Sequence, residues 1–496
     1  GNTLIQQTGT GATTLGRIAI TFDGNSFSVK SDLIMPAQAG EIFQADEGLT
    51  KMYDELAAKI APTLEKVVGR TETTLYGGSY NSKNVSRMVE TNLGSLIGDA
   101  MIDSSKKLVE GTEHEETPIV ALENGGAVRS KISSGFISME DILQVLPLDN
   151  RLSLQVINPN ILYQTMERGV CKQNNPAEVG DAIDGFFGGY PQISGMRIEY
   201  DITKTPYDTE HPEKGEGERV TKIVLLNEDG TDKQELDRKD TSTKILFSCN
   251  DYTITEYPMV SNIPVEKKGD FLSDVLADYI YKLTIDNKGS FSYPLNQGRS
   301  KLSKNDSLFM PFDATITADL GGEILALKQI SVQIDNQEPQ EMTTDENGIV
   351  IIKELSSGGH GIRIEYNGLS SDAYVDETVG LKEATIVLGT NEEKNIDSTI
   401  NVISQIPGDV ASEDAGLVEF ARASYESLTD SQKSQVTNYD TLVQAENVLK
   451  NTNNIANMIT RPSSENQTVI VIIASAAGVI IIAVIVALIV RRKKNR

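Results

Sequence analysis

The stretch 123-ENGGAVRSKISSGFISMEDILQVLPLDN-150 decides the fold class of the central part of this chain. A short apolar segment, 118-PIVAL-122, comes directly before it. Within the stretch, 138-SMEDILQVL-146 has helical spacing of apolar residues and begins with a serine, a residue that caps helices. We therefore expect a strand, a glycine turn and a helix in immediate succession.

The glycine pair and the arginine in this turn have two interpretations. Gly125 and Gly126 allow a backbone to approach a ligand or a neighbouring strand closely. Arg129 offers a planar fork that suits a carboxylate or a phosphate. The alternative is an ordinary strand-to-helix turn with a solvated arginine, because glycine pairs are common turn signals. Spacing alone leaves both interpretations open.

Helical and strand patterns alternate on both sides of this stretch. Helical patterns cover residues 88–101, 160–170 and 270–283, and strand patterns cover 195–202, 219–226 and 244–250. The mixture predicts one α+β domain over residues 71–302.

The chain before this domain has a different pattern. Residues 15–22 and 26–29 alternate as strands do and flank Asp23 and Gly24, which predicts a hairpin within residues 1–35. Residues 36–70 contain apolar positions at a helical period and are expected to form a connector helix. Since the chain opens with Gly1 and not Met, we expect that the natural N-terminus is missing and that this hairpin ends a preceding domain.

Two further modules follow the α+β domain. Short strand patterns with glycine turns between them predict a small β-sandwich, Ig-like or prealbumin-like, over residues 306–390. Residues 397–457 have helical patterns, and 429-TDSQ-432 is a capping box for one helix. Both modules resemble the spacers of bacterial surface proteins, so a passive wall spacer is one function to consider.

The C-terminus predicts a membrane anchor. Residues 469–490 carry no charge and are long enough to span a bilayer as a helix. The basic tail 491-RRKKNR-496 marks the cytoplasmic side, so we expect a single-pass plasma-membrane protein with its ectodomain outside the cell. The segment 459-ITRPSSENQT-468 contains no LPxTG-like sorting motif, which favours a retained anchor on a Gram-positive cell surface.

Composition excludes some functions. The 496 residues carry a formal net charge of -26, which argues against a nucleic-acid partner because such sites are basic. Two cysteines, Cys171 and Cys249, provide no disulfide framework, and three histidines provide no histidine-rich metal centre. Composition does not predict an oligomeric state.

Four ordered segments together carry a family resemblance. They are 87-RMVETNLGSLIGDAM-101, the stretch 123–150, 190-YPQISGMRIEYD-201 and 217-GERVTKIVLL-226. Over residues 71–302 the chain resembles the C-terminal domain of the 5'-nucleotidase family, of the UDP-sugar hydrolase and 2',3'-cyclic phosphodiesterase type. In that family this domain holds the nucleoside and part of the phosphate, and an N-terminal metallophosphoesterase domain hydrolyses the ester with two divalent metal ions.

The resemblance implies roles for individual residues. Arg87, before the ETN motif, and Arg129, which ends the motif begun by Gly125 and Gly126, correspond to substrate-binding arginines. Lys83 stands where some members have a further arginine, and a lysine offers a point charge without the fork. Asn150 corresponds to an asparagine whose amide reads the edge of a base.

Two departures from the family pattern concern the base. The family stacks the base between two aromatic rings, yet the first ring position is Leu148 and the second falls near Asp251 or Tyr252. The family's glycine loop is also absent from 250-NDYTITEYP-258, where Tyr252 or Tyr257 could take the place of a ring. Losing one ring matters because a ring-base stack contributes roughly 1 to 3 kcal/mol.

The resemblance also sets expectations for the whole protein. Residues 1–22 resemble the final strands of the metallophosphoesterase domain, so we expect no catalytic residue and no metal ligand in this chain, with both metal ions on the missing domain. The chain alone would then be inactive, while its parent would be a surface hydrolase for nucleotides or nucleotide-sugars. The alternative is a non-catalytic surface nucleotide-binding or adhesin module.

Overall fold

The computed structural model describes residues 7–8, 14–35, 45–81, 83–173, 187–295, 297–303, 311–335, 337–389, 392–460, 472–475 and 478–481. The chain divides into two compact units, Gly1–Leu64 and Glu65–Arg496.

The first unit contains a hairpin and a helix. Strands β1 (Leu15–Phe22) and β2 (Phe27–Ile34) pair antiparallel, and the carboxylate of Asp23 accepts hydrogen bonds from the main-chain nitrogens of Asn25 and Ser26, which closes the turn. The hairpin is thus confirmed, with a longer second strand than predicted. Helix α2 (Glu47–Leu64) also forms, but no residue in it is buried, so its apolar face remains exposed.

A five-stranded mixed sheet forms the centre of the second unit. Its order is β14 (Val265–Phe271), β8 (Arg151–Ile157), β13 (Ile245–Asn250), β6 (Ile119–Asn124) and β9 (Pro191–Ser194). Strands β6 and β13 run parallel, and β8 and β9 run antiparallel to them. The C-terminal ends of β6 and β13 therefore meet the N-terminal ends of β8 and β9. We call this border, formed by residues 124–126, 150–151, 190–191 and 250–252, the glycine edge.

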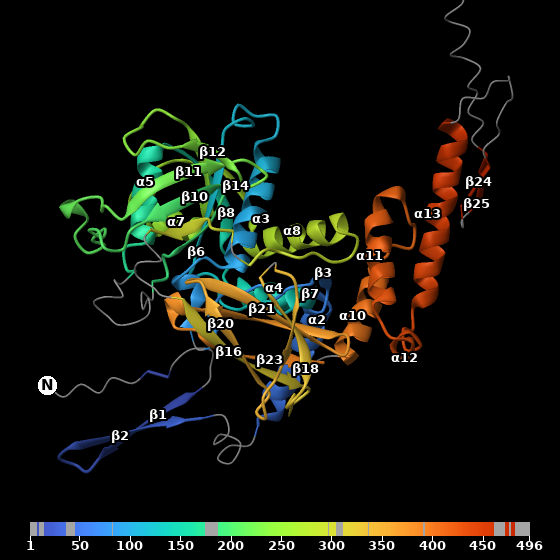
Figure 1. Cartoon of the computed structure of the whole chain (residues 1–496), viewed down its shortest axis with the longest axis horizontal. Helices are drawn as coiled ribbons and strands as arrows, with labels where there is room; N and C mark the ends of the chain where they lie inside the picture. The colour runs from blue at the N-terminus through green and yellow to red at the C-terminus, as the bar shows by residue number, and fades with distance from the viewer. Residues whose placement is uncertain are drawn as a thin grey trace, which may run out of the picture. The chain divides into compact units, whose positions relative to one another are not determined.

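Both faces of this sheet are covered (Figure 1). One face packs on helices α3 (Asn92–Val109), α4 (Met139–Val145) and α8 (Leu272–Asp286). The other packs on α5 (Pro159–Gly169) and on a sheet of order β12 (Asp232–Glu235), β11 (Val220–Leu226), β10 (Met196–Tyr200) and β15 (Ser300–Leu302). Two apolar cores thus enclose the central sheet, as expected for an α+β domain.

Helix starts follow local capping chemistry. Ser138 caps α4, as predicted, and it forms a full capping box with Asp141. Helix α3 begins at Asn92, later than predicted, because Thr91 caps it by accepting a hydrogen bond from Gly94. The residues just before it form the small hairpin of β4 (Ser79–Tyr80) and β5 (Lys83–Asn84), followed by the 3-10 turn η1 (Val85–Arg87).

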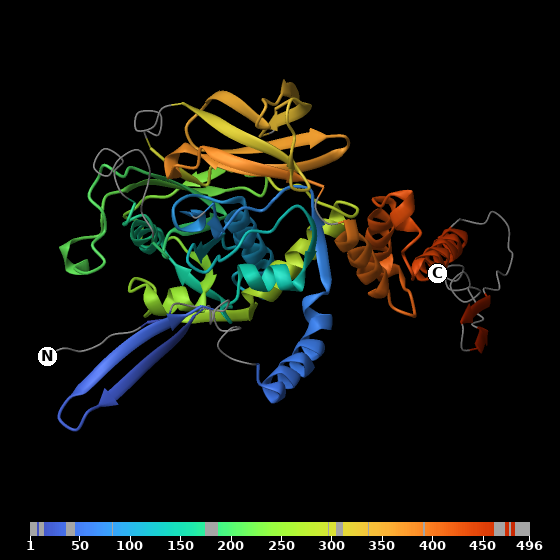
Figure 2. The same ribbon diagram turned by 90° about the horizontal axis from the view of Figure 1, so that it is seen from below.

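The residues that follow the α+β domain form the predicted β-sandwich (Figure 2). One sheet contains β16 (Phe312–Leu320), β17 (Glu323–Ile324), β20 (Ile349–Leu355) and β23 (Glu383–Leu388). The other contains β18 (Gln329–Ile334), β19 (Gln340–Thr343), β21 (Gly359–Tyr366) and β22 (Leu369–Asp376). Alternate residues of both sheets fill a common core that includes Ile316, Val332 and Ile364.

Four helices form the next module. They are α10 (Glu392–Ser404), α11 (Ala415–Glu426), α12 (Asp430–Lys433) and α13 (Tyr439–Thr460). The capping box predicted at Thr429 is present, with Gln432 as its second member. Helix α10 also joins the module to β3 (Val67–Thr71), because Asn401 accepts a hydrogen bond from the main-chain nitrogen of Val67.

The predicted membrane helix over residues 469–490 is not found in the described part of the chain. Most of that segment, and the basic tail 491–496, lie outside the described residues. The residues that are described form an antiparallel pair, β24 (Ile472–Ser475) and β25 (Gly478–Ile481). Isoleucine and valine have a high strand propensity, which agrees with this pairing. No described helix is both long enough and apolar enough to cross a bilayer.

Candidate functional site

The glycine edge brings together most of the predicted substrate residues. Gly125 and Gly126 follow β6, Asp251 and Tyr252 follow β13, and Asn150 precedes β8. The strand register shows that these ends are neighbours: Asn250 pairs with Leu152, and Asn124 pairs with Pro191. Residues that are more than a hundred positions apart in the sequence therefore share one border of the sheet.

Arg87 reaches this edge from the turn η1. A methyl group at Gly125 would overlap the carbonyl oxygen of Ser86, so only glycine allows η1 to lie this close to the end of β6. A methyl group at Gly188 would lie 3.8 Å from a terminal guanidinium nitrogen of Arg87 and 3.7 Å from the Cα of Gly126. The guanidinium of Arg87 is thus placed beside two glycines with little side-chain bulk around them.

The glycine pair does not offer its amides to a ligand. The main-chain nitrogen of Gly125 donates to the carbonyl oxygen of Tyr190 at 2.7 Å, and that of Gly126 donates to the carbonyl oxygen of Gly188 at 2.8 Å. The two glycines instead permit the close approach of neighbouring segments. A glycine pair can allow close approach of a ligand or of a neighbouring segment, and here it allows the approach of segments of the same chain.

Arg129 is positioned by its main chain. Its nitrogen donates to the carbonyl oxygen of Val145 at 2.9 Å, and its side chain is exposed. Burial lowers the pKa of Arg87, and the nearby charge of Arg129 lowers it further. The two guanidinium groups are therefore close enough to repel each other, an arrangement that a bound anion would stabilise.

The residues predicted to contact a base differ in exposure. Leu148 is 44% exposed and Tyr252 is 50% exposed, both near the glycine edge. Tyr252 is among the groups that raise the pKa of Arg87, so the two side chains lie within electrostatic range of each other. Tyr257 is buried instead: its hydroxyl donates to the carbonyl oxygen of Gly189, and its ring lies 4.0 Å from the guanidinium of Arg168. Tyr257 belongs to the core, whereas Tyr252 is accessible.

The remaining predicted residues have structural partners. The carboxylate of Asp251 accepts a hydrogen bond from the main-chain nitrogen of Arg151 at 3.2 Å. The carbonyl oxygen of Asn150 accepts from Leu272 at 2.9 Å, and its side chain is half-buried. Lys83 lies in the small hairpin opposite Tyr80, four residues before Arg87.

A buried cluster of three polar side chains beneath the edge was not predicted. The side-chain amide of Asn250 donates to the carboxylate of Glu123 at 2.6 Å and to the side-chain oxygen of Asn124 at 2.8 Å. The Asn250 oxygen accepts from Thr253 and caps α7 (Asp251–Glu256), the helix that carries Tyr252. The sequence indicates this cluster only by the polar residues that end the apolar runs 118–124 and 244–250.

Burial dominates the chemistry of Glu123. Its side chain is fully buried, which raises its pKa to about 8 although the hydrogen bond from Asn250 opposes this. The carboxyl group is therefore largely protonated at neutral pH. Its role is to orient Asn250, and through it the start of α7.

Gln192 is a second unpredicted residue, and it fixes η1 from the start of β9. Its amide nitrogen donates to the carbonyl oxygens of Ser86 and Val89, both at 2.8 Å. Its amide oxygen accepts from the main-chain nitrogen of Thr91 at 3.0 Å. One buried glutamine thus ties the segment that bears Arg87 to the central sheet.

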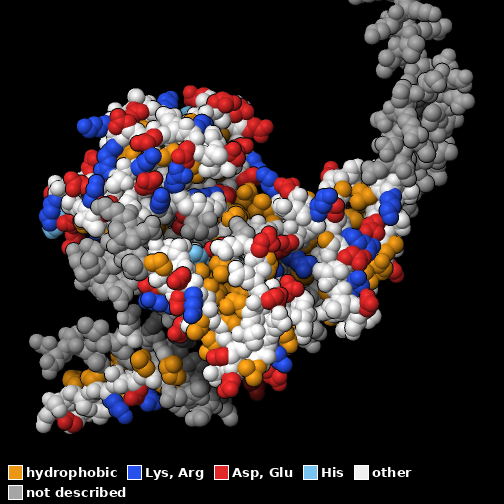
Figure 3. Space-filling model, viewed as in Figure 1, with side chains coloured by type: hydrophobic (Ala, Val, Ile, Leu, Met, Phe, Trp, Pro, Cys, Tyr) orange, Lys and Arg blue, Asp and Glu red, His pale blue; other side chains and the backbone are white. Residues whose placement is uncertain are grey.

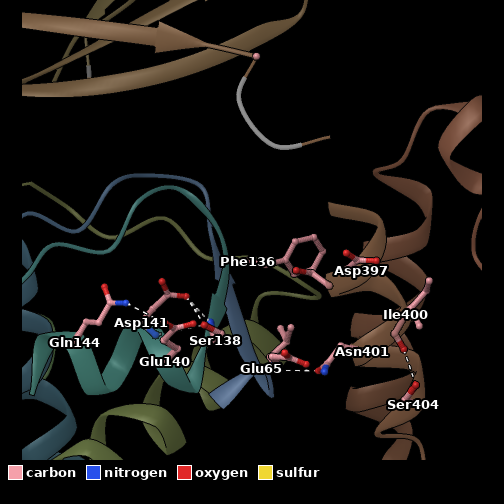
Figure 4. A pocket seen from close by; sticks show the side chains of 13 residues that line it. Glu65, Phe136, Ser138, Glu140, Asp141, Gln144, Asp397, Ile400, Asn401 and Ser404 are labelled. Carbon is pink, nitrogen blue, oxygen red and sulfur yellow. Dashed lines mark hydrogen bonds between the residues drawn. The ribbon is translucent and has the colours of Figure 1, made fainter. Parts of the chain in front are cut away.

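An open depression lies elsewhere on the molecule. It has a volume of about 1210 Å³ and is bordered by α4 and α10 (Figure 4). Glu140 and Asp141 on one side and Asp397 on the other make it acidic, and its described lining contains no lysine or arginine. Because such a lining repels anions, we place the candidate site at the glycine edge and not in this depression.

Metal ligands do not gather in the described part of the chain. No group of three or more histidine, cysteine, aspartate or glutamate side chains there is arranged to hold a metal ion. On the face shown in Figure 3, acidic and basic side chains are interspersed. The described residues thus offer a positively charged pair at one sheet edge but no arrangement suited to a divalent cation.

Comparison with known proteins agrees with the motifs. Residues 67–246 match the family model of the 5'-nucleotidase C-terminal domain. This part of the chain is a 5'-nucleotidase C-terminal domain. The glycine edge, with Arg87, Arg129, Asn150 and the turn after β6, lies within or next to the matched residues.

Curated relatives cover the same part of the chain. A trifunctional nucleotide phosphoesterase protein of Bacillus subtilis is 24% identical over 230 residues, which are 46% of this chain and 13% of that protein. A snake venom 5'-nucleotidase of Naja atra is 25% identical over 216 residues, 43% of this chain and 36% of the enzyme. The chain thus spans well under two thirds of the length of these relatives.

Among solved structures, the 5'-nucleotidase precursor of Thermus thermophilus is 20% identical, with a TM-score of 0.40. The likeness covers 59% of this chain and 50% of that structure.

Proposed function

We propose that the 5'-nucleotidase C-terminal domain of this chain binds the phosphate and base of a nucleotide or nucleotide-sugar at the glycine edge. The place of Arg87 beside Gly126 and Gly188, with the charge of Arg129 close enough to lower the pKa of Arg87, carries this proposal. A phosphate between two guanidinium groups would form charge-assisted hydrogen bonds with both and would remove their mutual repulsion. Gly125, Gly126 and Gly188 keep side chains away from this place.

The base would lie on the side of Tyr252. Its exposed ring offers a stacking surface within electrostatic range of Arg87, and the half-buried side chain of Asn150 would read a base edge. Leu148 provides an apolar contact where the family has a ring, so we expect weaker stacking than two rings would give. Lys83 and Asp251 are assigned to the outer part of the same site.

In the parent protein, this domain would serve a hydrolase that acts on phosphoric ester bonds. We assign the two divalent metal ions to a metallophosphoesterase domain of the parent, where they would activate a water and neutralise the phosphoryl group. The residues of the present chain would bind and orient the substrate for that domain. Taken alone, the chain would bind nucleotides without hydrolysing them.

A titration tests binding directly. Purified chain would be titrated calorimetrically with AMP, UMP and UDP-glucose, and with adenosine and uridine as ligands without phosphate. We expect the nucleotides to bind and the nucleosides to bind at least about tenfold more weakly, which corresponds to one charged hydrogen-bond pair. No binding of any nucleotide at millimolar concentration would contradict the proposal.

A second candidate, a non-catalytic surface nucleotide-binding or adhesin module, is favoured by Leu148 and by the missing glycine loop. It shares the binding site, so a hydrolysis assay on the parent protein distinguishes the two candidates.

The uncharged run 469–490 and the basic tail support attachment to a membrane at the cell surface, which fractionation of cells that produce the chain would test.

A further inference from the structure

One carboxylate of the β-sandwich binds the α+β domain at several atoms. Asp372 on β22 accepts hydrogen bonds from the main-chain nitrogen of Thr74 at 2.8 Å and from its hydroxyl at 2.7 Å. It also accepts from the hydroxyl of Tyr76 at 3.4 Å. A single side chain of the sandwich therefore fixes three donors of the segment 74–76.

Aromatic residues extend this contact. The ring of Tyr76 lies 5.1 Å from that of Tyr80 and 5.5 Å from that of Tyr374 on β22. The main-chain nitrogen of Tyr374 donates to the hydroxyl of Tyr80 at 3.2 Å. All three rings are buried, and they share an apolar cluster with Val85, the first residue of η1.

The same segment contacts both arginine-bearing parts of the site. Leu75 exchanges main-chain hydrogen bonds with Ile132, three residues after Arg129, at 2.8 and 3.0 Å. The main-chain nitrogen of Gly78 donates to the hydroxyl of Ser86 at 2.6 Å, directly before Arg87. Side chains alternate along an extended segment, so Thr74 and Tyr76 face the sandwich while Leu75 faces the core of the α+β domain.

We propose that Asp372 and Tyr374 are positioning residues for the anion site: they hold residues 74–80, which in turn fix the main chain on which Arg87 and Arg129 stand. The sandwich is then part of the binding apparatus and not only a spacer. This inference rests on the proposed function, because it concerns the same two guanidinium groups. Small displacements of positioned groups have large effects on binding, so anchoring this segment matters.

The test compares a ligand that has a phosphate with one that lacks it. In the full chain, Asp372→Ala is expected to raise the Kd for AMP by roughly three- to tenfold. The Kd for adenosine should change by less than about twofold, because the base side of the site does not depend on the segment 74–80. A general loss of stability would instead raise the Kd values for AMP and adenosine by similar factors.

Further variants complete the design. Asp372→Asn keeps the shape and one acceptor, and it should restore most of the affinity for AMP. If Asp372→Ala does not fold, Thr74→Val, which removes the hydroxyl that donates to Asp372, should weaken AMP binding and leave adenosine binding nearly unchanged. Ile330→Val lies in the buried core of the sandwich two strands away from β22, and it should leave both Kd values unchanged.

The outcomes separate the two claims. If Arg87→Ala weakens AMP binding but Asp372→Ala and Asp372→Asn both bind AMP like the wild type, the positioning role is wrong and the proposed function stands. Equal weakening of AMP and adenosine in Asp372→Ala would also overturn it. If the wild-type chain does not bind AMP, the proposed function fails, and the positioning role fails with it.

Discussion

Gly78 packs against the main chain of Arg129 so closely that a methyl group at position 78 would overlap the carbonyl carbon of Arg129. Gly78 also has a positive φ of 55°, a region that other residues enter at a cost. The small hairpin and the loop that bears Arg129 are therefore fitted to each other. Changes at Gly78 should affect both stability and the anion site.

Gly78→Ala is expected to destabilise the domain by roughly 2 to 4 kcal/mol, since backbone strain and overlap add. Urea unfolding would measure this loss. Gly111→Ala is the matched control, because Gly111 has a similar φ of 69° but open space around it. It should cost only about 1 kcal/mol, and an equal loss in both variants would show that the contact with Arg129 is unimportant.

Glu123→Gln should change how stability depends on pH. The pKa of Glu123 is raised to about 8 in the folded state, so its stabilising protonated form is fully present below pH 4.5 and is lost as the pH rises through 8. Glutamine cannot ionise, so the variant should be more stable than the wild type at pH 7.5, on the order of 2 kcal/mol, and similar to it at pH 4.5. Chemical unfolding at both pH values measures this. The exposed Glu110→Gln should show no such difference, and a variant that tracks the wild type at both pH values would contradict the buried state of Glu123.

His360 in the β-sandwich predicts a second pH dependence. Burial opposes its charge, but hydrogen bonds to Asp335 at 2.8 Å and to the carbonyl oxygen of Ser356 at 2.9 Å raise its pKa above the usual value. This stabilisation is fully present below pH 6.5 and is lost as the pH rises through the folded-state pKa. His360→Gln should therefore destabilise strand β21 by about 1 kcal/mol at pH 5.5 and by less at pH 8.5. Hydrogen exchange of residues 359–366, compared with the wild type at each pH, measures the effect, and equal losses at both pH values would refute it.

Tyr252 should contribute to AMP binding, whereas Tyr257 should contribute to the stability of the fold. Tyr252→Ala should weaken AMP binding by roughly 1 to 2 kcal/mol and leave stability unchanged, because its ring is exposed. Tyr257→Phe should lower stability by roughly 1 kcal/mol, since it leaves the carbonyl oxygen of Gly189 without its donor, and should bind AMP normally. Calorimetry and urea unfolding on both variants would show the contrast. Normal AMP binding by Tyr252→Ala would remove Tyr252 from the site.

Sequence patterns predicted the elements whose periodicity is local. Ser138 caps a helix as the serine predicted, and Thr429 does so as its capping box predicted. The strand before Gly125 forms as the apolar run indicated. Patterns of this kind depend on residues three or four positions apart. They succeed because capping and burial of one face are local requirements.

The features that were not predicted depend on distant partners. The main-chain amides of Gly125 and Gly126 donate to carbonyl groups more than sixty residues away in the sequence. No local pattern could therefore show whether these amides bind a ligand or another segment of the chain. The contact between Asp372 and Thr74 joins residues almost three hundred positions apart. The predicted helix over 469–490 rested on an uncharged apolar run and its basic flank, and the described parts of that run, Ile472–Ser475 and Gly478–Ile481, form paired strands.

The most direct test of the central claim is the affinity of the Arg87→Ala and Arg129→Ala chains for AMP and for adenosine. If both guanidinium groups hold one phosphate, each variant should bind AMP at least about tenfold more weakly than the wild type, with adenosine affinity nearly unchanged. Unchanged AMP affinity in either variant, or equal losses for AMP and adenosine, would contradict the account.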